Sequence, residues 1–590
     1  MGALMRKGSG RMLTKTTEIP KFIGLPNRAY AVCAPLQGGW FALFVVFACL
    51  SAGPRALASN DSADANDTTG SELEEITVTA TKREENIQKV PVSIYALSQN
   101  DLELAGAKTM DDFAALTPGI QFDNQSGYGT STLTFISIRG INSDIGASTT
   151  GVYIDDTAIQ GRLNQFTNFG NPYPVYFDLN HIEVARGPQG TLFGAGAEGG
   201  TVRFVFNQPD LNQFSGIVST EVADIQDGGI NYESGVAAGG PIIPGVLGFR
   251  SSAWFRQDGG YINSIDPFTG AITDANANRS QSKAFRLALL GDFGGVTIEP
   301  SIYYQSHFIH DAIGFYGSLS DPDAGEFNSG HVVALPADDS YYLAALNVHS
   351  NLEAVKLTSV TSYFSRFATT VDDETGTVGS LGPAAGLPDG TAGYGNPQGP
   401  AWPTSYIDGA AEPNQTSQRI LTEELRAESA DPSARLLWVA GLFYSRSTQD
   451  EVTNFYDTFA AEANGIPPRD SLLYEGTIAI DTQIAAFGQI DFRITDPLKL
   501  TAGVRIADMK YSFETLAAGA FNAGAPPIGT NATSEHPVTP KIALSYQADN
   551  ENLFYVSAAK GYRMGGGNSP LPDLCPSSAP PTYSSDSLWS

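Results

Sequence analysis

The sequence of 590 residues has few charges, few cysteines and no long apolar run. Charged residues make up 16 % of it, against roughly 25 % in a typical soluble chain. The cysteines Cys33, Cys49 and Cys575 are too few and too scattered for a disulfide framework or a cysteine-based metal site. Beyond Leu50, no segment approaches the run of about 18 apolar residues that a transmembrane helix requires. These absences exclude a disulfide-built fold and a helical membrane protein.

Basic residues are scarce in particular. The chain has 34 Lys and Arg against 63 Asp and Glu, which gives a formal net charge of −29. Proteins that bind nucleic acid neutralise phosphates with basic side chains and release counterions. A chain this acidic repels the phosphate backbone, so we exclude nucleic acid as a partner.

The sequence also lacks a motif for catalysis or for a resident cofactor. His307 and His310 are three positions apart, and on a strand they face opposite sides and cannot share a metal. The glycines of 194–199 spell a dinucleotide fingerprint, but that motif requires a helix after it, and 202–206 has the composition of a strand. We therefore expect no enzyme and no bound metal or cofactor.

What the sequence has in abundance favours β-structure. It contains 62 Gly, 24 Tyr and 32 Phe, and apolar and polar residues alternate in segments such as 484–493, 499–506 and 541–547. Asp496–Pro497 makes a short turn between two of these segments, whereas 370–415 is a long stretch rich in Gly, Pro and Asp. Segments near 10 residues, joined alternately by short turns and long loops, favour a membrane barrel over a soluble sandwich.

The N-terminus has the pattern of an export signal. Trp40–Leu50 is an apolar run of eleven residues, which follows basic residues and precedes the small-residue site Ala56–Ala58. We expect cleavage after Ala58. Two alternatives stay open: Met12 as the true start, and Cys49 as a lipidated residue.

From about residue 72 to Phe214 the periodicity is mixed. Residues 100–116 have the pattern of one helix with Asp101 as a possible cap, and Pro118–Gly119 ends it. Short strands separated by glycines follow. This region predicts a compact α+β domain, and the alternating segments begin after it.

Several motifs carry a resemblance to a known family. The segment Glu74–Thr81 resembles the energy-coupling box of TonB-dependent outer-membrane receptors. Five motifs then occur in the order of that family's plug domain: Pro91–Ile94, Leu116–Gly119, Ile138–Ile141, Val152–Asp155 and Ile182–Gly194. Three more resemble its barrel strands: Glu424–Arg426, Trp438–Tyr444 and Lys560–Arg563. The resemblance covers about Glu72 to Ser590.

The resemblance implies a β-dominated fold in which an N-terminal α+β plug domain lies inside a transmembrane antiparallel β-barrel. It implies a protein of the Gram-negative outer membrane that contacts its lipid. The expected divisions are a leader and signal peptide at 1–58, a periplasmic extension with the box at 59–84, the plug domain at 85–213 and the barrel at 214–590.

The resemblance also implies how the box works. Its residues are Glu75, Ile76, Thr77, Val78, Thr79 and Ala80. An extended box would add as a strand to TonB, which works with ExbB and ExbD, because backbone hydrogen bonds bind while alternate side chains read the partner.

Three residues in family-like motifs are candidates for a lock between plug and barrel. Arg139 and Arg186 each precede a glycine in the plug, and Glu424 is the carboxylate expected to hold them from the barrel. The alternative is that both arginines bind carbonyl groups of the plug or water.

The substrate that the family implies first is a ferric siderophore, with iron only as part of the chelate. Glycans, cobalamin and aromatic compounds are alternatives, as is a receptor or adhesin that does not transport. The aromatic residues Tyr303, Tyr304, Phe308, Phe315 and Tyr316 either stack on substrate or belong to the membrane girdles. No substrate-binding residue is assigned.

Strand number leads to one further expectation. We count about thirteen alternating segments after Phe214, whereas plugged transporters of the outer membrane have about 22 strands. The sequence is therefore expected to form an incomplete barrel, a receptor truncated at its C-terminus, and transport would belong to an intact parent.

Overall fold

The structure is a computed structural model. The described residues are 77–590, apart from 80, 84, 125–133, 144, 164–168, 268, 312, 376–409, 458–472, 520–527, 550–551, 569–579 and 581. The chain divides into two units, Met1–Leu73 and Glu74–Ser590, and every described residue belongs to the second. The predicted leader and signal peptide, and all three cysteines, lie outside the described residues.

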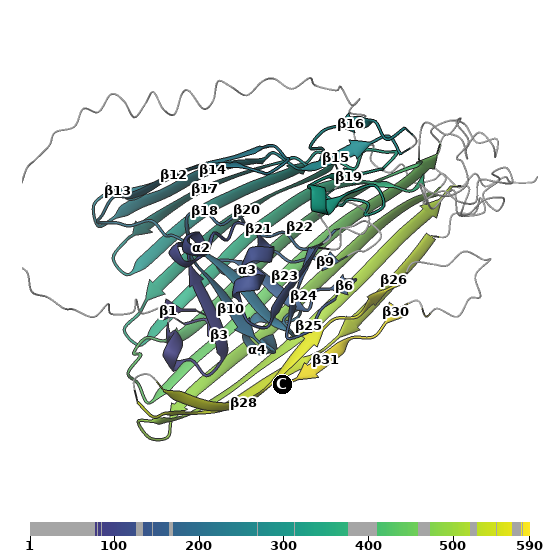
Figure 1. Cartoon of the computed structure of the whole chain (residues 1–590). Coiled ribbons are helices and arrows are strands. Elements are labelled where there is room, and N and C mark those ends of the chain that lie inside the picture. Colours follow the sequence, from purple (N-terminus) through teal and green to yellow (C-terminus); the bar gives the residue numbers. More distant parts are fainter. Residues whose placement is uncertain are drawn as a thin grey trace, which may run out of the picture. The chain divides into compact units, whose positions relative to one another are not determined.

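A single large sheet of 15 strands dominates the second unit (Figure 1). Its strands are antiparallel, and neighbours in the sheet are neighbours in the chain. In order they are β12 (Ser215–Asp224), β13 (Ile230–Ile243), β14 (Leu247–Asp258), β17 (Ser280–Asp292), β18 (Val296–Ile309), β20 (Ala337–Asn351), β21 (Val355–Asp373), β22 (Ala410–Ser429), β23 (Leu436–Asp457), β24 (Leu473–Arg493), β25 (Leu498–Ala518), β27 (Val538–Gln547), β28 (Leu553–Arg563) and β31 (Asp586–Trp589), with β26 (Ile528–Glu535) beside β25.

Alternation along these strands separates an apolar outer face from a polar inner face. On β25, Val504 and Ile506 are 42 % and 56 % exposed, while Arg505 between them is buried. This is the face assignment that the alternating segment 499–506 predicts. The apolar face suits lipid and the polar one a lumen, as in outer-membrane barrels.

The connections between strands differ sharply on the two sides of the sheet. One side has short turns, such as those at 244–246 and 494–497, whereas the other has connections as long as 259–279 and 310–336. Extracellular loops are long and periplasmic turns are short in such barrels. We call the ends with long connections the outer ends. A small sheet of β15 (Ile262–Ile265), β16 (Ile272–Asp274) and β19 (Phe327–Ser329) lies within two of these connections.

The domain that precedes the large sheet is built on five strands. Their order is β3 (Ser93–Ser98), β10 (Leu179–Arg186), β11 (Gly200–Phe206), β7 (Thr150–Ile154) and β8 (Thr157–Ala158), and only β11 and β7 are parallel. Three pairs of short strands accompany the chain elsewhere: β4 (Ile120–Asn124) with β5 (Thr134–Ile138), β6 (Gly146–Ala147) with β9 (Arg162–Leu163), and β29 (Gly566–Gly567) with β30 (Thr582–Tyr583). β11 follows the glycines of 194–199 directly, so the strand expected there is confirmed.

The helices of this domain are short. They are α2 (Gln99–Ala105), α3 (Met110–Leu116) and α4 (Gly190–Phe193), with 3-10 turns η1 (Ile87–Lys89) here and η3 (Pro322–Ala324) in a long connection. Among the described residues, no helix has the length and apolar character needed to cross a membrane.

The expectation of one helix over 100–116 is wrong. Gly106 adopts a left-handed conformation (φ 69°) that ends α2, and Thr109 caps a new helix. The residue that caps α2 is Ser98, not Asp101, whose carboxylate closes a capping box from the third helical position. Apolar periodicity continued across the break because both helices face one core, through Leu102 and Phe113.

That core extends from the plug domain to the inner face of the large sheet. Its buried side chains include Phe204 and Ile182 of the plug domain and Tyr303, Tyr341 and Phe364 of the sheet. In Figure 1 the plug elements lie against the concave face of the large sheet. Packing against the sheet therefore fixes where the plug domain sits.

The large sheet remains open within the described residues. Its path runs from β12 to β31, and no pairing between these two strands occurs there. With β26 and β27 taken as one interrupted strand and the four-residue β31 set aside, thirteen strands remain, as counted from the sequence.

Candidate functional site: the seam between the box segment, the plug domain and the large sheet

The described part of the predicted box is docked inside the molecule. β1 (Thr77–Val78) pairs antiparallel with β2 (Glu85–Asn86), and the Val78 side chain is fully buried. We call residues 77–86 the box segment. Glu75, Ile76 and Ala80 of the predicted box lie outside the described residues.

Thr79 is held by the plug domain. Its backbone amide donates to Glu183 Oε1 at 2.9 Å, and its hydroxyl accepts a hydrogen bond from Arg203. Glu183 on β10 and Arg203 on β11 are direct cross-strand partners, 3.5 Å apart between charged atoms. His181 also contacts Glu183, at 2.8 Å. The central sheet of the plug domain therefore presents a polar socket to the box segment.

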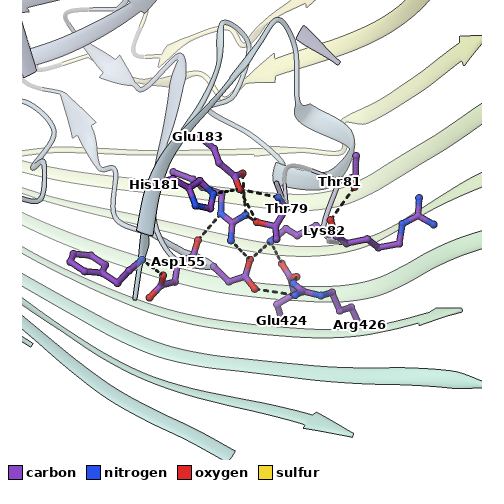
Figure 2. Close-up of polar contacts among 12 residues, drawn as sticks. Thr79, Thr81, Lys82, Asp155, His181, Glu183, Glu424 and Arg426 are labelled. Carbon is purple, nitrogen blue, oxygen red and sulfur yellow. Dashed lines mark hydrogen bonds and ion pairs between the residues drawn. The ribbon is translucent and has the colours of Figure 1, made fainter. Parts of the chain in front are cut away.

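Lys82 joins the plug domain to the large sheet (Figure 2). Its ammonium lies 3.5 Å from Asp156 of the plug domain and 3.2 Å from Glu424 of β22. Arg426 bridges the same two carboxylates, at 3.0 Å from Asp156 and 2.8 Å from Glu424. The Lys82 side chain is only 2 % exposed. Two cations and two carboxylates from three parts of the chain thus form one buried network.

Arg83 makes a second link to the large sheet. Its guanidinium donates to Asp491 of β24, which also accepts a hydrogen bond of 2.5 Å from Thr501. The Arg83 side chain is 8 % exposed and that of Asp491 4 %. Lys82 and Arg83 therefore contact the inner face of the sheet at two different strands.

Charges this deeply buried depend on their partners. Burial alone would raise the pKa of Asp156, but Arg426, Lys82 and Arg203 outweigh it and hold that pKa well below its ordinary value. Burial likewise opposes ionisation of Glu183, and mainly Arg203 keeps its pKa lowered. Removal of one cation from such a network leaves a buried carboxylate without compensation, which is costly.

The predicted lock residues are only partly brought together. Glu424 does bind one residue from outside the sheet, Lys82 of the box segment, and its other ion pair is with Arg426 of its own strand. Arg186 instead donates to the carbonyl of Pro118 at 2.8 Å, which was the alternative left open for it. Arg139 belongs to a turn with φ 55°. The pairing of Arg139 or Arg186 with Glu424 is therefore wrong for this structure, and the lock role itself stays a prediction.

Sequence analysis missed most of this seam. Lys82 and Arg83 directly follow the box in a chain poor in basic residues, which was a usable signal. Arg426 lies within the family-like motif that identified Glu424. Asp156 and Asp491 carried no comparable signal.

Further contacts join the plug domain to the sheet away from the box segment. Arg162 binds Asp481 of β24 through two nitrogens at 2.9 Å. Asp178 binds Arg250 of β14 through both carboxylate oxygens. Thr191 donates to the carbonyl of Thr539 on β27 at 2.9 Å. Water can replace a polar partner in such hydrogen bonds and ion pairs more easily than it can enter an apolar core.

A cavity of about 230 Å³ lies between the plug domain and the outer ends of four strands. Residues 108–110 and 171–176 line it from the plug side, and β14, β17, β18 and β20 from the sheet. No group of three or more His, Cys, Asp or Glu able to hold a metal occurs in the described part of the chain.

The aromatic residues considered for substrate binding divide into three groups. Tyr303 is buried on the inner face, 4 % exposed, whereas Tyr304 and Phe308 point outward. Phe315 and Tyr316 belong to a long connection, where Phe315 packs edge-on against Phe327. The outward pair fits a membrane girdle, so the five residues do not form one cluster.

Comparison with known proteins agrees with this architecture. A model of the TonB-dependent receptor plug domain matches residues 86–201, and a model of the TonB-dependent receptor-like β-barrel matches residues 311–585. The pesticin receptor of Yersinia pestis is 31 % identical over 209 residues, 34 % of this chain and 27 % of that protein. The vitamin B12 transporter BtuB of Vibrio vulnificus is 25 % identical over 289 residues, 48 % of this chain and 42 % of that protein.

A solved structure shares the fold. The ferric yersiniabactin uptake receptor FyuA of Yersinia pestis superposes with a TM-score of 0.62 at 18 % identity, over 82 % of this chain and 67 % of that one. The chain thus matches about a quarter to two fifths of the length of these curated relatives.

Proposed function

Because the chain belongs to the TonB-dependent outer-membrane receptors, we propose that it serves the energised uptake of a scarce, large substrate, in the first place a ferric siderophore. The observation that carries this proposal is the seam. A box segment is docked by buried ion pairs that reach both the plug domain and the large sheet. A pull on this segment acts directly on the ion pairs that join it to the plug domain and to the large sheet.

The geometry gives the pull a short path. Lys82 lies four residues after Val78, and an extended chain spans at most about 3.5 Å per residue. Withdrawal of Val78 by roughly 14 Å therefore draws Lys82 out of its place between Asp156 and Glu424. Arg83 follows and leaves Asp491. Both links to the sheet are broken by one movement.

The partner that would pull is TonB, driven by ExbB and ExbD. β1 is already extended and pairs with only two residues of β2, so a longer strand of a partner can replace that pairing by β-addition. Buried ion pairs resist spontaneous release, since breaking one costs about 3–5 kcal/mol. Opening the seam then requires energy delivered by TonB, because the outer membrane itself supplies none.

The names of the relatives support the substrate class without fixing it. Two of them are receptors for pesticin and for ferric yersiniabactin, and one transports vitamin B12. We place substrate binding in the cavity above the plug domain, with iron held only by its chelator. Cobalamin, glycans and aromatic compounds are the alternatives.

Uptake of radioactive iron in iron-limited cells that express the full-length receptor tests this proposal. Ferric chelates of the hydroxamate and catecholate classes should enter in the presence of TonB and stop entering when TonB is deleted. Labelled cobalamin serves as the second substrate arm. Uptake that is equal with and without TonB would contradict the proposal.

A further inference from the structure

The connections at the outer ends of the strands are strongly acidic. Their described residues are 225–229, 259–267, 269–279, 310–311, 313–336 and 374–375. These described residues include eight Asp or Glu but only one basic residue, Arg279. A surface of one sign raises the local concentration of ligands of the opposite sign and speeds their arrival. The entrance to the lumen therefore favours cations.

The inner face just below this entrance is acidic as well. Asp372 on β21, Glu412 on β22, Glu451 on β23 and Glu475 on β24 occupy the outer parts of four consecutive strands. Asp372 and Glu412 are direct cross-strand partners. We call these four residues the acidic patch. Like charges this close repel one another, and a cation brought among them relieves that repulsion.

Neutral polar side chains lie between the carboxylates of the patch. Asn414 donates to Asp372 at 2.8 Å. Thr370 is the cross-strand partner of Asn414, and Thr416 is that of Glu451. The hydroxyls of Thr370 and Thr416 have no hydrogen-bond partner in the described part of the chain, although the two residues are only 1 % and 2 % exposed. Buried hydroxyls without partners are expensive, and on this face they point to a polar ligand.

The cavity beside the plug domain continues the same chemistry. The Lys and the Arg that line it are already compensated: Arg256 lies 3.3 Å from Glu233 and 2.6 Å from Asp258, and Lys108 lies 3.1 Å from Glu221. An anionic ligand would have to compete with these carboxylates for each cation. A cationic ligand keeps every pair intact.

Four large aromatic side chains also line the cavity. They are Trp254, Tyr173, Tyr176 and Tyr341. The faces of such rings attract ammonium and guanidinium groups. Tyr173 adds a buried hydroxyl that has no hydrogen-bond partner within the described residues.

We propose that the substrate of this receptor carries a net positive charge, and that the acidic patch selects for it. This inference rests on the proposed uptake function and narrows it. The cationic group passes the acidic connections, meets the patch and finds aromatic faces in the cavity. Anionic chelates are disfavoured at each of these stages.

Three ferric tris-hydroxamates of one scaffold test the inference. The first carries a free terminal ammonium (net +1), the second is its N-acetyl derivative (neutral), and the third its N-succinyl derivative (net −1). Binding to outer membranes that contain the full protein is measured at low and at high ionic strength. We expect the +1 probe to bind at least about 10-fold more tightly than the −1 probe at low salt, with a smaller ratio at high salt.

The variant for this test is Glu451→Gln with Glu475→Gln, which keeps shape and removes two carboxylates from the patch. Its control is Asp431→Asn, which removes a carboxylate from the short turn between β22 and β23 on the other side of the sheet. The double variant should lower the preference for the +1 probe, and the control should retain it. The salt dependence of the unchanged protein gives the same answer if the double variant does not fold.

The possible results distinguish a failure of the charge preference from a failure of the proposed uptake function. Equal binding of the three probes, or tighter binding of the −1 probe, would overturn the inference on charge and leave siderophore uptake standing. Binding of none of the probes would overturn both the inference and the proposed substrate class.

Discussion

At the scale of single residues, Glu424 of the large sheet is a main contact point for the box segment and the plug domain. Its carboxylate forms ion pairs with Lys82 of the box segment and with Arg426 of its own strand. Glu424→Gln removes the charge and leaves Lys82 and Arg426 to share Asp156 with Arg203. We expect a loss of roughly 3 kcal/mol of plug anchoring, measured as increased permeability to large solutes.

Glu423 provides a matched control for that prediction. It is the next residue on β22, and its carboxylate bonds Ser359 and Thr361 on the opposite face of the sheet. Glu423→Gln should leave permeability unchanged. An unaltered pore in Glu424→Gln would remove Glu424 from the lock.

The lowered pKa values of Asp156 and Glu183 predict how docking of the box segment depends on pH. Docking adds Lys82 to the groups that lower the pKa of Asp156, and the Thr79 amide to those that lower the pKa of Glu183. Each carboxylate charge therefore stabilises docking, and this stabilisation is lost as pH falls through the lowered pKa. A nitroxide label on Thr77→Cys should therefore keep its mobility from neutral pH down to about 4.5, and become mobile only below 3.8.

A second label distinguishes release of the box segment from general unfolding. Leu104 on α2 is 80 % exposed, so Leu104→Cys carries the nitroxide without disturbing the core. Its mobility should stay constant over the range in which that of the Thr77 label changes. Release of the Thr77 label at pH 6 would show that the two carboxylates do not hold the segment.

Sequence reasoning reached Glu424 through its motif but could not find its partner. Lys82 and Glu424 are 342 positions apart, and their contact depends on how the plug domain is seated against β22. No local pattern encodes that seating. Arg186 shows the same limit, since its bond to the Pro118 carbonyl depends on a fold within the plug domain.

At the scale of elements, the decisive one is the two-residue strand β1. Val78→Pro removes the backbone amide at this position and fixes its φ angle, which disfavours a strand added to a partner. Uptake should be abolished, while substrate binding to outer membranes stays intact. Val78→Ala, which keeps the amide, is the control and should retain uptake.

Unchanged uptake by Val78→Pro would contradict the assignment of this segment as the box that binds TonB. Loss of binding together with uptake would show instead that the substitution damaged the plug domain. The two readouts must therefore be taken from the same membranes.

The elements themselves were predictable to different degrees. β24 and β25 followed from alternation, because one face of each is apolar and exposed and the other carries buried polar side chains. The break between α2 and α3 did not, because the apolar positions on both sides of Gly106 serve one core. A left-handed glycine interrupts a helix without interrupting its periodicity.

At the scale of the whole molecule, the plug domain must move against the sheet if it is to open a path. A disulfide between Thr191→Cys on α4 and Thr539→Cys on β27, in a Cys575→Ser background, ties the two together where Thr191 bonds the Thr539 carbonyl at 2.9 Å. We expect the oxidised protein to lose uptake and the reduced protein to regain it. Substrate binding should survive in both states.

A disulfide within the sheet is the control for this prediction. Thr477 and Thr515 are cross-strand partners on β24 and β25, with hydroxyls 2.7 Å apart. Oxidation of Thr477→Cys with Thr515→Cys should leave uptake unchanged. Full uptake through the oxidised plug-to-sheet disulfide would show that the plug domain need not separate from β27.

The docked box segment has a thermal consequence. Its withdrawal uncovers Asp156, Glu183, Glu424 and Asp491 together with a single buried valine. Exposure of polar surface lowers the heat capacity and exposure of apolar surface raises it, so the two contributions nearly cancel here. The free energy of undocking should then vary almost linearly with temperature, without the curvature of an oily interface. The work of undocking in such a receptor should therefore change steadily from a cold habitat to a warm one, with no intermediate temperature at which it is greatest.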